Sequence, residues 1–193
     1  MRQGTMRAPL AERGDDFYET PACATRALLR SGVLDGIGSI WEPCAGRGAI
    51  ARELIAAGHR VVAQDLVAHD GADGYVVPRI DFLMERRAPD GVAAIMTNPP
   101  YKLADAFVRH GRDLVETVVV LLRLAALEGA GRSDLIDGRL DEILVGIERL
   151  PMMHRDGWAG PKTDSGGVPF AWYVFRRTPA KPARLRRISW RAS

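Results

Sequence analysis

The residues in this sequence best suited to chemistry are Asn98-Pro99-Pro100-Tyr101, which follow the apolar stretch 92–96. Two consecutive prolines fix the backbone and remove two N–H donors, which leaves carbonyl oxygens free to accept hydrogen bonds. The Asn98 side-chain oxygen and a proline carbonyl can then both accept from one –NH2 group. These acceptors favour a tetrahedral nitrogen whose lone pair can attack an electrophilic methyl group, and Tyr101 offers a face for a stacked base. The alternative is a plain strand-ending turn, because Asn and Pro are both turn residues.

A second candidate is the turn 42–48, in which a strand ends at Glu42 and a helix begins after Gly46 and Gly48. Glycines let the backbone approach a ligand, and a helix N-terminus supplies free N–H groups. The next strand ends at Asp65, roughly 20 residues on, a spacing at which an acidic side chain reaches ribose hydroxyls. Together these features favour an adenosine-type cofactor. Ordinary strand–helix packing and a solvated loop aspartate are the alternatives.

Strands and helices must alternate to position these residues. Apolar periodicity and turn residues predict helices at 22–30, 49–57, 104–112 and within 125–135. They predict strands at 39–42, 60–64, 75–80, 91–97, 116–122, 142–148 and 170–176. The last two strands have no room for a crossover helix, so an antiparallel pair is expected there. The pattern predicts an α/β fold with a mainly parallel sheet, helices on both faces and an antiparallel closing strand.

Segments 42–48, Asp65 and 98–101 together resemble the class I S-adenosylmethionine-dependent amino-methyltransferases. The subgroup with the strongest resemblance is the DNA adenine-N6 methyltransferases, including small phage- and prophage-type members. Segment 15–21 resembles that group's N-terminal motif, and the resemblance extends over about 15–177. It implies a Rossmann-like fold with a seven-stranded sheet, S-adenosylmethionine as cofactor and DNA as partner.

The resemblance also implies roles for the matching residues. Phe17, Tyr18 and Thr20 would close over the methionine moiety, and Asp65 would hold the ribose. In the catalytic loop, Asn98 and Pro99 would orient the amine, Pro100 would stiffen the loop and Tyr101 would hold the base. The full implied cofactor-binding set is Phe17, Tyr18, Thr20, Glu42, Ala45, Gly46, Gly48, Asp65, Leu66, Asp81 and Phe82.

Other acceptors remain open. Protein glutamine methyltransferases share Asn-Pro-Pro-Tyr, but they typically carry an extra N-terminal helical domain, which residues 1–19 cannot supply. An adenine in RNA is a further alternative. Cytosine N4 is disfavoured, because those relatives usually have Ser at the position of Asn98. A non-catalytic nucleic-acid-binding relative is the alternative from a different class.

Bulk properties narrow the class of protein. The chain has 193 residues, 47% of them hydrophobic, which fits one globular domain. No apolar run spans a bilayer and no signal peptide is visible, so a cytoplasmic location without a membrane partner is expected. Two cysteines and four scattered histidines show no metal-ligand spacing, so we expect no metal. Cys44 could suggest a cytosine-C5 nucleophile, but its place in the glycine turn favours a small buried side chain.

The expected organisation is an N-terminal tail at 1–14, a methyltransferase domain at 15–177 and a basic C-terminal tail at 178–193. The tail is either solvated or a phosphate-contacting arm. The chain has no room for a large target-recognition domain. The loop 152–169, with His154, Arg155, Trp158 and Lys162, is the best candidate for a short substitute, and a plain connection is the alternative. The sequence does not indicate an oligomeric state.

Overall fold

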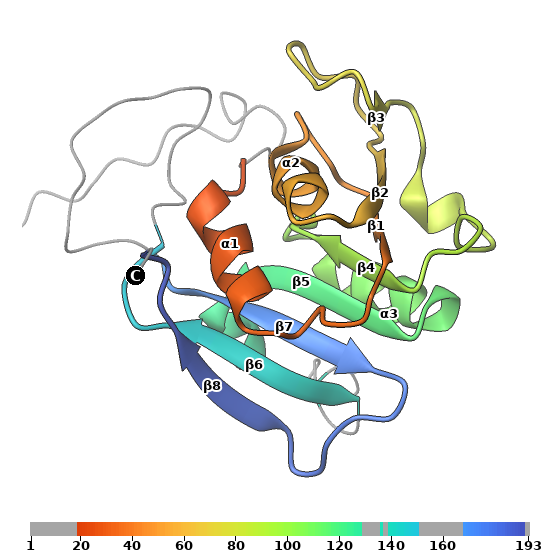
Figure 1. Ribbon diagram of the computed structural model, residues 1–193. Coiled ribbons are helices and arrows are strands. Elements are labelled where there is room, and N and C mark those ends of the chain that lie inside the picture. Colours follow the sequence, from red (N-terminus) through yellow and green to blue (C-terminus); the bar gives the residue numbers. More distant parts are fainter. Residues whose placement is uncertain (1–18, 129–135, 137–138, 151–167, 192–193) are drawn as a thin grey trace, which may run out of the picture.

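One eight-stranded mixed sheet organises the chain, with the strand order β3-β2-β1-β4-β5-β7-β6-β8 (Figure 1). The computed structural model describes residues 19–128, 136, 139–150 and 168–191. The strands are β1 Ser39–Glu42, β2 Arg60–Gln64, β3 Val76–Val77, β4 Ala94–Thr97, β5 Thr117–Arg123, β6 Leu140–Gly146, β7 Phe170–Arg176 and β8 Arg184–Ile188. The helices are α1 Ala22–Arg30, α2 Ala49–Ala56 and α3 Ala104–Leu114, with short 3-10 segments η2 Phe82–Met84 and η3 Leu124–Leu127.

The sheet is parallel apart from one strand. Strands β3, β2, β1, β4 and β5 pair in parallel, β7 pairs antiparallel with both β5 and β6, and β8 returns to a parallel pairing with β6. The antiparallel pair predicted for 142–148 and 170–176 is therefore confirmed. Because the first five strands are parallel, their carboxyl ends share one edge of the sheet, where ligands bind in open α/β folds.

The eighth strand corrects two expectations, the seven-stranded sheet and the basic tail at 178–193. Residues 184–188 form β8 at the sheet edge, in register with β6 from Glu142↔Arg184 to Gly146↔Ile188. The physical reason is charge pairing. Arg184 donates to Asp141 at 2.9 Å, and Arg186 pairs with Glu142, so the arginines neutralise buried acids. A strand this basic and this exposed carries no apolar signal in the sequence.

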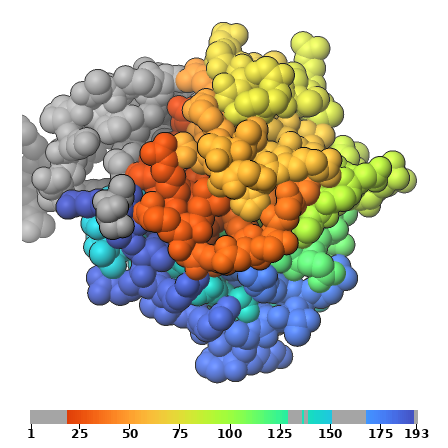
Figure 2. All heavy atoms as spheres, in the orientation of Figure 1, coloured from red at the N-terminus to blue at the C-terminus, as the bar shows by residue number. Residues whose placement is uncertain are grey.

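Helices cover both faces of the sheet, as predicted. Helices α1 and α2 pack on one face, where Leu28 and Leu54 meet Ile40 and Trp172 in the first core cluster. Helix α3 packs on the other face through Phe107 and Val108. Atoms of α1 and α2 cover the middle of the molecule in Figure 2, and the C-terminal strands lie below them. The sheet is thus packed between two apolar clusters, one on each of its faces.

Several predicted boundaries shift. The strand predicted at 75–80 is only the two-residue β3, and the strand predicted at 91–97 begins at Ala94. The helix predicted within 125–135 falls mostly on residues 129–135, which lie outside the described part, and the described residues before them form η3. Gly58 follows α2 with a φ of 92°, as expected of a helix-ending glycine. No helix among the described residues is long and apolar enough to cross a bilayer.

Candidate active site

A cavity of about 320 Å³ opens at the carboxyl edge of the parallel strands. Its wall combines the turn after β1, the loop after β2, residues 80–83 around η2, and the loop after β4. The predicted site residues that line it are Thr20, Glu42, Ala45, Gly46, Asp65, Leu66, Asp81, Phe82, Asn98, Pro99, Pro100 and Tyr101. Thr20 and Tyr101, 81 positions apart in the sequence, thus meet around one space.

The glycine turn is locked to the end of β2 by Asp65. The Gly46 amide donates to Asp65 Oδ2 at 2.7 Å, and the Val67 amide donates to Asp65 Oδ1 at 2.8 Å. Gly46 has a φ of 56°, a left-handed conformation that glycine adopts without steric cost. Asp65 is 8% exposed and lines the cavity, so its carboxylate shapes the turn and also faces the ligand space.

Glu42 lies at the floor of the cavity, at the end of β1. Its side chain is 1% exposed, and its Oε2 has no hydrogen-bond partner among the described residues. Burial raises the pKa of Glu42 well above its ordinary range, and the nearby Asp65 charge raises it further, against the hydrogen bond from the Ala51 amide. No arginine or lysine neutralises this carboxyl group in the part of the chain that the structure describes.

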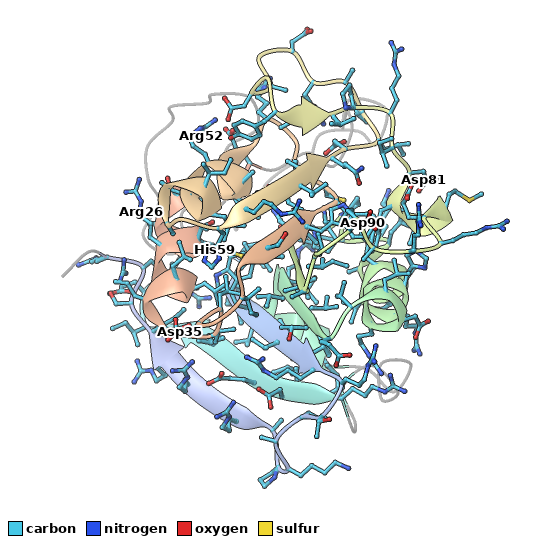
Figure 3. All side chains as sticks on the ribbon, turned by 45° about the vertical axis from the view of Figure 1, so that its right-hand side comes forward. Arg26, Asp35, Arg52, His59, Asp81 and Asp90 are labelled. Carbon is cyan, nitrogen blue, oxygen red and sulfur yellow. The ribbon has the colours of Figure 1, made fainter. Side chains whose placement is uncertain are left out.

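The loop between β2 and β3 is fastened to the glycine turn. Arg47 donates to the Asp70 carbonyl at 2.9 Å, and Arg52 on α2 pairs with Asp73 at 2.9 Å. Figure 3 shows Arg52 on α2 beside this loop. Gly48, with a φ of 93°, has no room for a Cβ, because Asp73 Oδ2 would lie 2.8 Å from it and the Tyr75 hydroxyl 3.0 Å. Gly48, predicted as a cofactor-binding residue, is not among the residues that line the cavity.

Residues Asp81 and Phe82 form the opposite wall. Asp81 Oδ1 accepts from the Leu83 amide at 3.0 Å and so caps η2 (Figure 3). The Phe82 ring is 2% exposed, with its centroid 5.1 Å from Trp41, 4.9 Å from Phe107 and 4.9 Å from His110. This aromatic cluster ties η2 to the sheet and to α3.

The corner 98–101 begins directly after β4, the strand next to β1. Pro99 is buried, while Asn98 and Tyr101 are half-buried, and all four residues of the corner line the cavity. The Tyr101 ring lies 5.9 Å from Phe170 on β7, and the Arg123 guanidinium lies 4.9 Å above the Tyr101 ring. The corner therefore faces the same space as the glycine turn and is not sealed in the core.

Cys44 also lines the cavity, but it is unsuited to act as a nucleophile. Burial raises the pKa of its thiol, and the Asp65 and Glu42 carboxyl groups raise it further, so the thiol stays protonated. The described residues contain no group of three or more His, Cys, Asp or Glu side chains arranged to hold a metal ion.

Some cavity residues were missed from the sequence, among them Arg47, Val67, His69, Ile80, Leu83 and Leu103. His69 Nε2 lies 3.5 Å from Asp65 Oδ1, an i,i+4 spacing that could have suggested the contact. The aliphatic members carry no sequence signal. Phe17, Tyr18 and most of the loop 152–169, including its four candidate recognition residues, lie outside the described part of the chain.

Comparison with known proteins identifies the fold of this chain through solved structures. No model of a known protein family matches the chain, and no curated protein matches its sequence. Among solved structures, a Listeria monocytogenes protein described as a class I S-adenosylmethionine-dependent methyltransferase has a TM-score of 0.61 at 14% identity. A Pyrococcus horikoshii protein described as an RNA methyltransferase scores 0.59 at 16% identity. A type I restriction-modification methyltransferase subunit from Streptococcus thermophilus scores 0.54 at 14% identity.

The matches cover most of this chain but differing shares of the others. They cover 88%, 83% and 82% of this chain, and 65%, 87% and 45% of the Listeria, Pyrococcus and Streptococcus chains. The chain thus spans less than two thirds of the Listeria protein and less than half of the restriction-modification subunit. At these identities the likeness establishes that the chain has the Rossmann-like fold of class I methyltransferase structures.

Proposed function

We propose that this chain is an S-adenosylmethionine-dependent methyltransferase that methylates N6 of adenine in DNA. The observation that carries the proposal is the meeting of two features in one cavity. The donor-poor corner 98–101 and the glycine turn 42–48, with Asp65, face the same space of about 320 Å³. A methyl donor and an amine acceptor must lie in line, and this edge of the sheet supplies one place for each.

The cavity residues fit the proposed cofactor. Glu42 offers a buried oxygen that lacks a partner within the described residues, suited to the positively charged amino group of a methionine moiety. Asp65 offers carboxylate oxygens at the β2 end, suited to ribose hydroxyls, with exposed Leu66 beside it for the adenine ring. Thr20, buried at the cavity wall, and Phe17 and Tyr18, by resemblance, complete the methionine end.

The corner residues prepare the acceptor. Asn98 and the Pro99 carbonyl accept the two hydrogens of the amino group, which turns its nitrogen lone pair toward the donor. Pro100 keeps the backbone rigid, and Tyr101 holds the base. When bound, S-adenosylmethionine supplies the electrophilic methyl group, so that an N–C bond forms and the S–C bond breaks with its electron pair left on sulfur. The proton lost from the nitrogen passes to water.

Asn98 argues against cytosine N4 as the acceptor, and the restriction-modification subunits among the similar structures favour DNA over RNA and protein. Methylation of adenine in RNA is the second candidate, because a protein described as an RNA methyltransferase is similar over 83% of this chain. Both acceptors require the base to leave its stack and enter the cavity.

The test is incubation of the protein with labelled S-adenosylmethionine and separate DNA, RNA and protein acceptors. Mass spectrometry then identifies the modified group. We expect N6-methyladenine in DNA. Label found only on glutamine side chains or only in RNA would overturn the DNA proposal.

Asn98→Ala should separate chemistry from cofactor binding. We expect the methylation rate to fall by at least about a hundredfold, the effect of losing one preorganised hydrogen-bonding group, with the cofactor Kd unchanged. Asp65→Ala is the matched opposite, expected to weaken cofactor binding itself. Full activity in Asn98→Ala would show that the corner is not the catalytic loop.

A further inference from the structure

Arg123 stands apart from the other arginines of the described chain. It ends β5 at the ligand-binding edge, its side chain is exposed, and its guanidinium lies 4.9 Å above the Tyr101 ring. Within the described ranges it pairs with no carboxylate. Arginines that do pair with carboxylates include Arg26, Arg52, Arg176, Arg177, Arg184 and Arg186.

The sheet register fixes where Arg123 lies. Thr97, the last residue of β4, pairs with Val120 of β5, so Arg123 extends beyond this pair to the level of the corner 98–101. On its other side Arg123 pairs with Phe170, whose ring lies 5.9 Å from Tyr101. Tyr101 lines the cavity and Arg123 does not, so the guanidinium lies just outside the cavity.

We propose that Arg123 binds the phosphodiester backbone of a nucleic-acid substrate beside the target nucleotide, with its guanidinium kept against the Tyr101 ring. This inference rests on the proposed function. A base held at Tyr101 brings its sugar and phosphate out of the cavity at this rim. Guanidinium stacked on a ring keeps its N–H edge free, and that edge matches two phosphate oxygens.

The assignment also bears on substrate class. A nucleic acid carries a phosphate beside every base, so an arginine next to the acceptor site meets an anion whatever the sequence, whereas a glutamine side chain brings no anion of its own. Phosphate contacts are independent of base sequence, and DNA and RNA share them. Arg123 would therefore supply affinity and orientation, while the corner 98–101 selects the amino group.

The test measures oligonucleotide affinity of the full chain across salt concentrations, with DNA and RNA of one sequence as separate arms. For Arg123→Gln we expect about tenfold weaker binding. We also expect the slope of log affinity against log salt to fall by roughly 0.9 for duplex DNA and 0.7 for single strands. Arg123→Lys should restore the salt slope. Arg177→Gln is the matched control, because Arg177 pairs with Glu116 at the opposite sheet edge, and it should change neither value.

The outcomes separate this inference from the proposed function. If the wild-type protein methylates adenine but Arg123→Gln keeps the wild-type affinity and salt slope, only the role of Arg123 is overturned. A lower melting temperature in both Arg123 variants with an unchanged slope has the same meaning, since it would show that the ring contact is only structural. If the wild-type protein methylates no nucleic acid, the proposed function itself fails.

Discussion

Two groups of buried acidic side chains in the same sheet differ in the hydrogen-bond and ion-pair partners of their carboxyl groups. Glu42, at the end of β1, is 1% exposed and has an oxygen without a partner among the described residues. Asp141 and Glu142, in β6, are 3% and 2% exposed. Asp141 accepts from the Ala180 amide at 2.6 Å, from Arg184 at 2.9 Å and from Arg176 at 3.2 Å.

The difference separates a binding region from a structural one. A buried carboxyl oxygen without a partner costs free energy, so its presence beside a cavity is consistent with a ligand that would satisfy it. The carboxylates in β6 already have their partners, and those partners join β8 and β7 to β6. The β7–β6–β8 half of the sheet therefore carries neutralised acids, and the parallel half holds a buried Glu42 oxygen without a partner among the described residues.

Asp141→Asn should give the largest loss of stability. The substitution leaves Arg176 and Arg184 without their shared carboxylate, and removing one member of a buried ion pair is strongly destabilising. Because the arginine side chains are 32% and 58% exposed, water offsets part of the loss. We expect the free energy of unfolding to fall by about 2–3 kcal/mol, measured by denaturant titration.

The pH dependence checks the cause of that loss. Burial alone would raise the pKa of Asp141, but the Ala180 amide and the two arginines hold it below its ordinary value of 3.8. The stabilisation is therefore present above pH 3.8 and is lost as the pH falls through the lowered pKa. The gap between wild type and Asp141→Asn should narrow in that acidic range. A gap that stays constant with pH, or cofactor binding lost in the variant, would contradict the division between the two regions.

Gly146→Ala should give a smaller loss, again confined to the structural half. An added Cβ would overlap the Trp190 indole, which is 4% exposed and donates to the Glu148 carbonyl at 2.8 Å. The indole must move, as in other overpacked cores, so we expect a loss of about 1–3 kcal/mol. Unfolding monitored by tryptophan fluorescence and a shifted native emission would report the movement.

Gly38→Ala is the matched control for this steric argument. Gly38 precedes β1, has no heavy atom within 4 Å of an added Cβ and has no left-handed φ. We expect its stability to change by less than about 0.5 kcal/mol. Equal losses in the two variants would show that the Trp190 contact is not the cause.

The two halves also differed in how far the sequence predicted them. The parallel half follows from apolar runs and turn residues, and its corner 98–101 and glycine turn line one cavity, as the family resemblance implies. Strand β8 was missed because its arginines are partnered by acids some forty residues earlier, and only the fold brings them together. The hydrogen bond from Gly46 to Asp65 was likewise invisible, since a strand-ending aspartate indicates a ligand contact as readily as a structural one.

Glu42→Gln should change stability with the opposite sign to the substitutions above. The folded-state pKa of Glu42 is raised, so from its ordinary value of 4.5 upward the folded protein holds a proton that the unfolded chain has released. Wild-type stability therefore falls with rising pH over this window. Glutamine stays neutral at every pH, so the variant should match the wild type below pH 4.5 and exceed it increasingly above.

The same substitution should weaken cofactor binding, because the cationic amino group of the methionine moiety would restore the charge balance that Glu42 lacks. Binding should then lower the pKa of Glu42 and release a proton, which calorimetry in buffers of different ionisation enthalpy would detect in the wild type and not in Glu42→Gln. A variant that is more stable but binds the cofactor more weakly would indicate that the Glu42 carboxyl group serves ligand binding at a cost in stability. If Glu42→Gln loses stability and binds the cofactor normally, Glu42 is a structural acid like Asp141, and the contrast between the two halves of the sheet disappears.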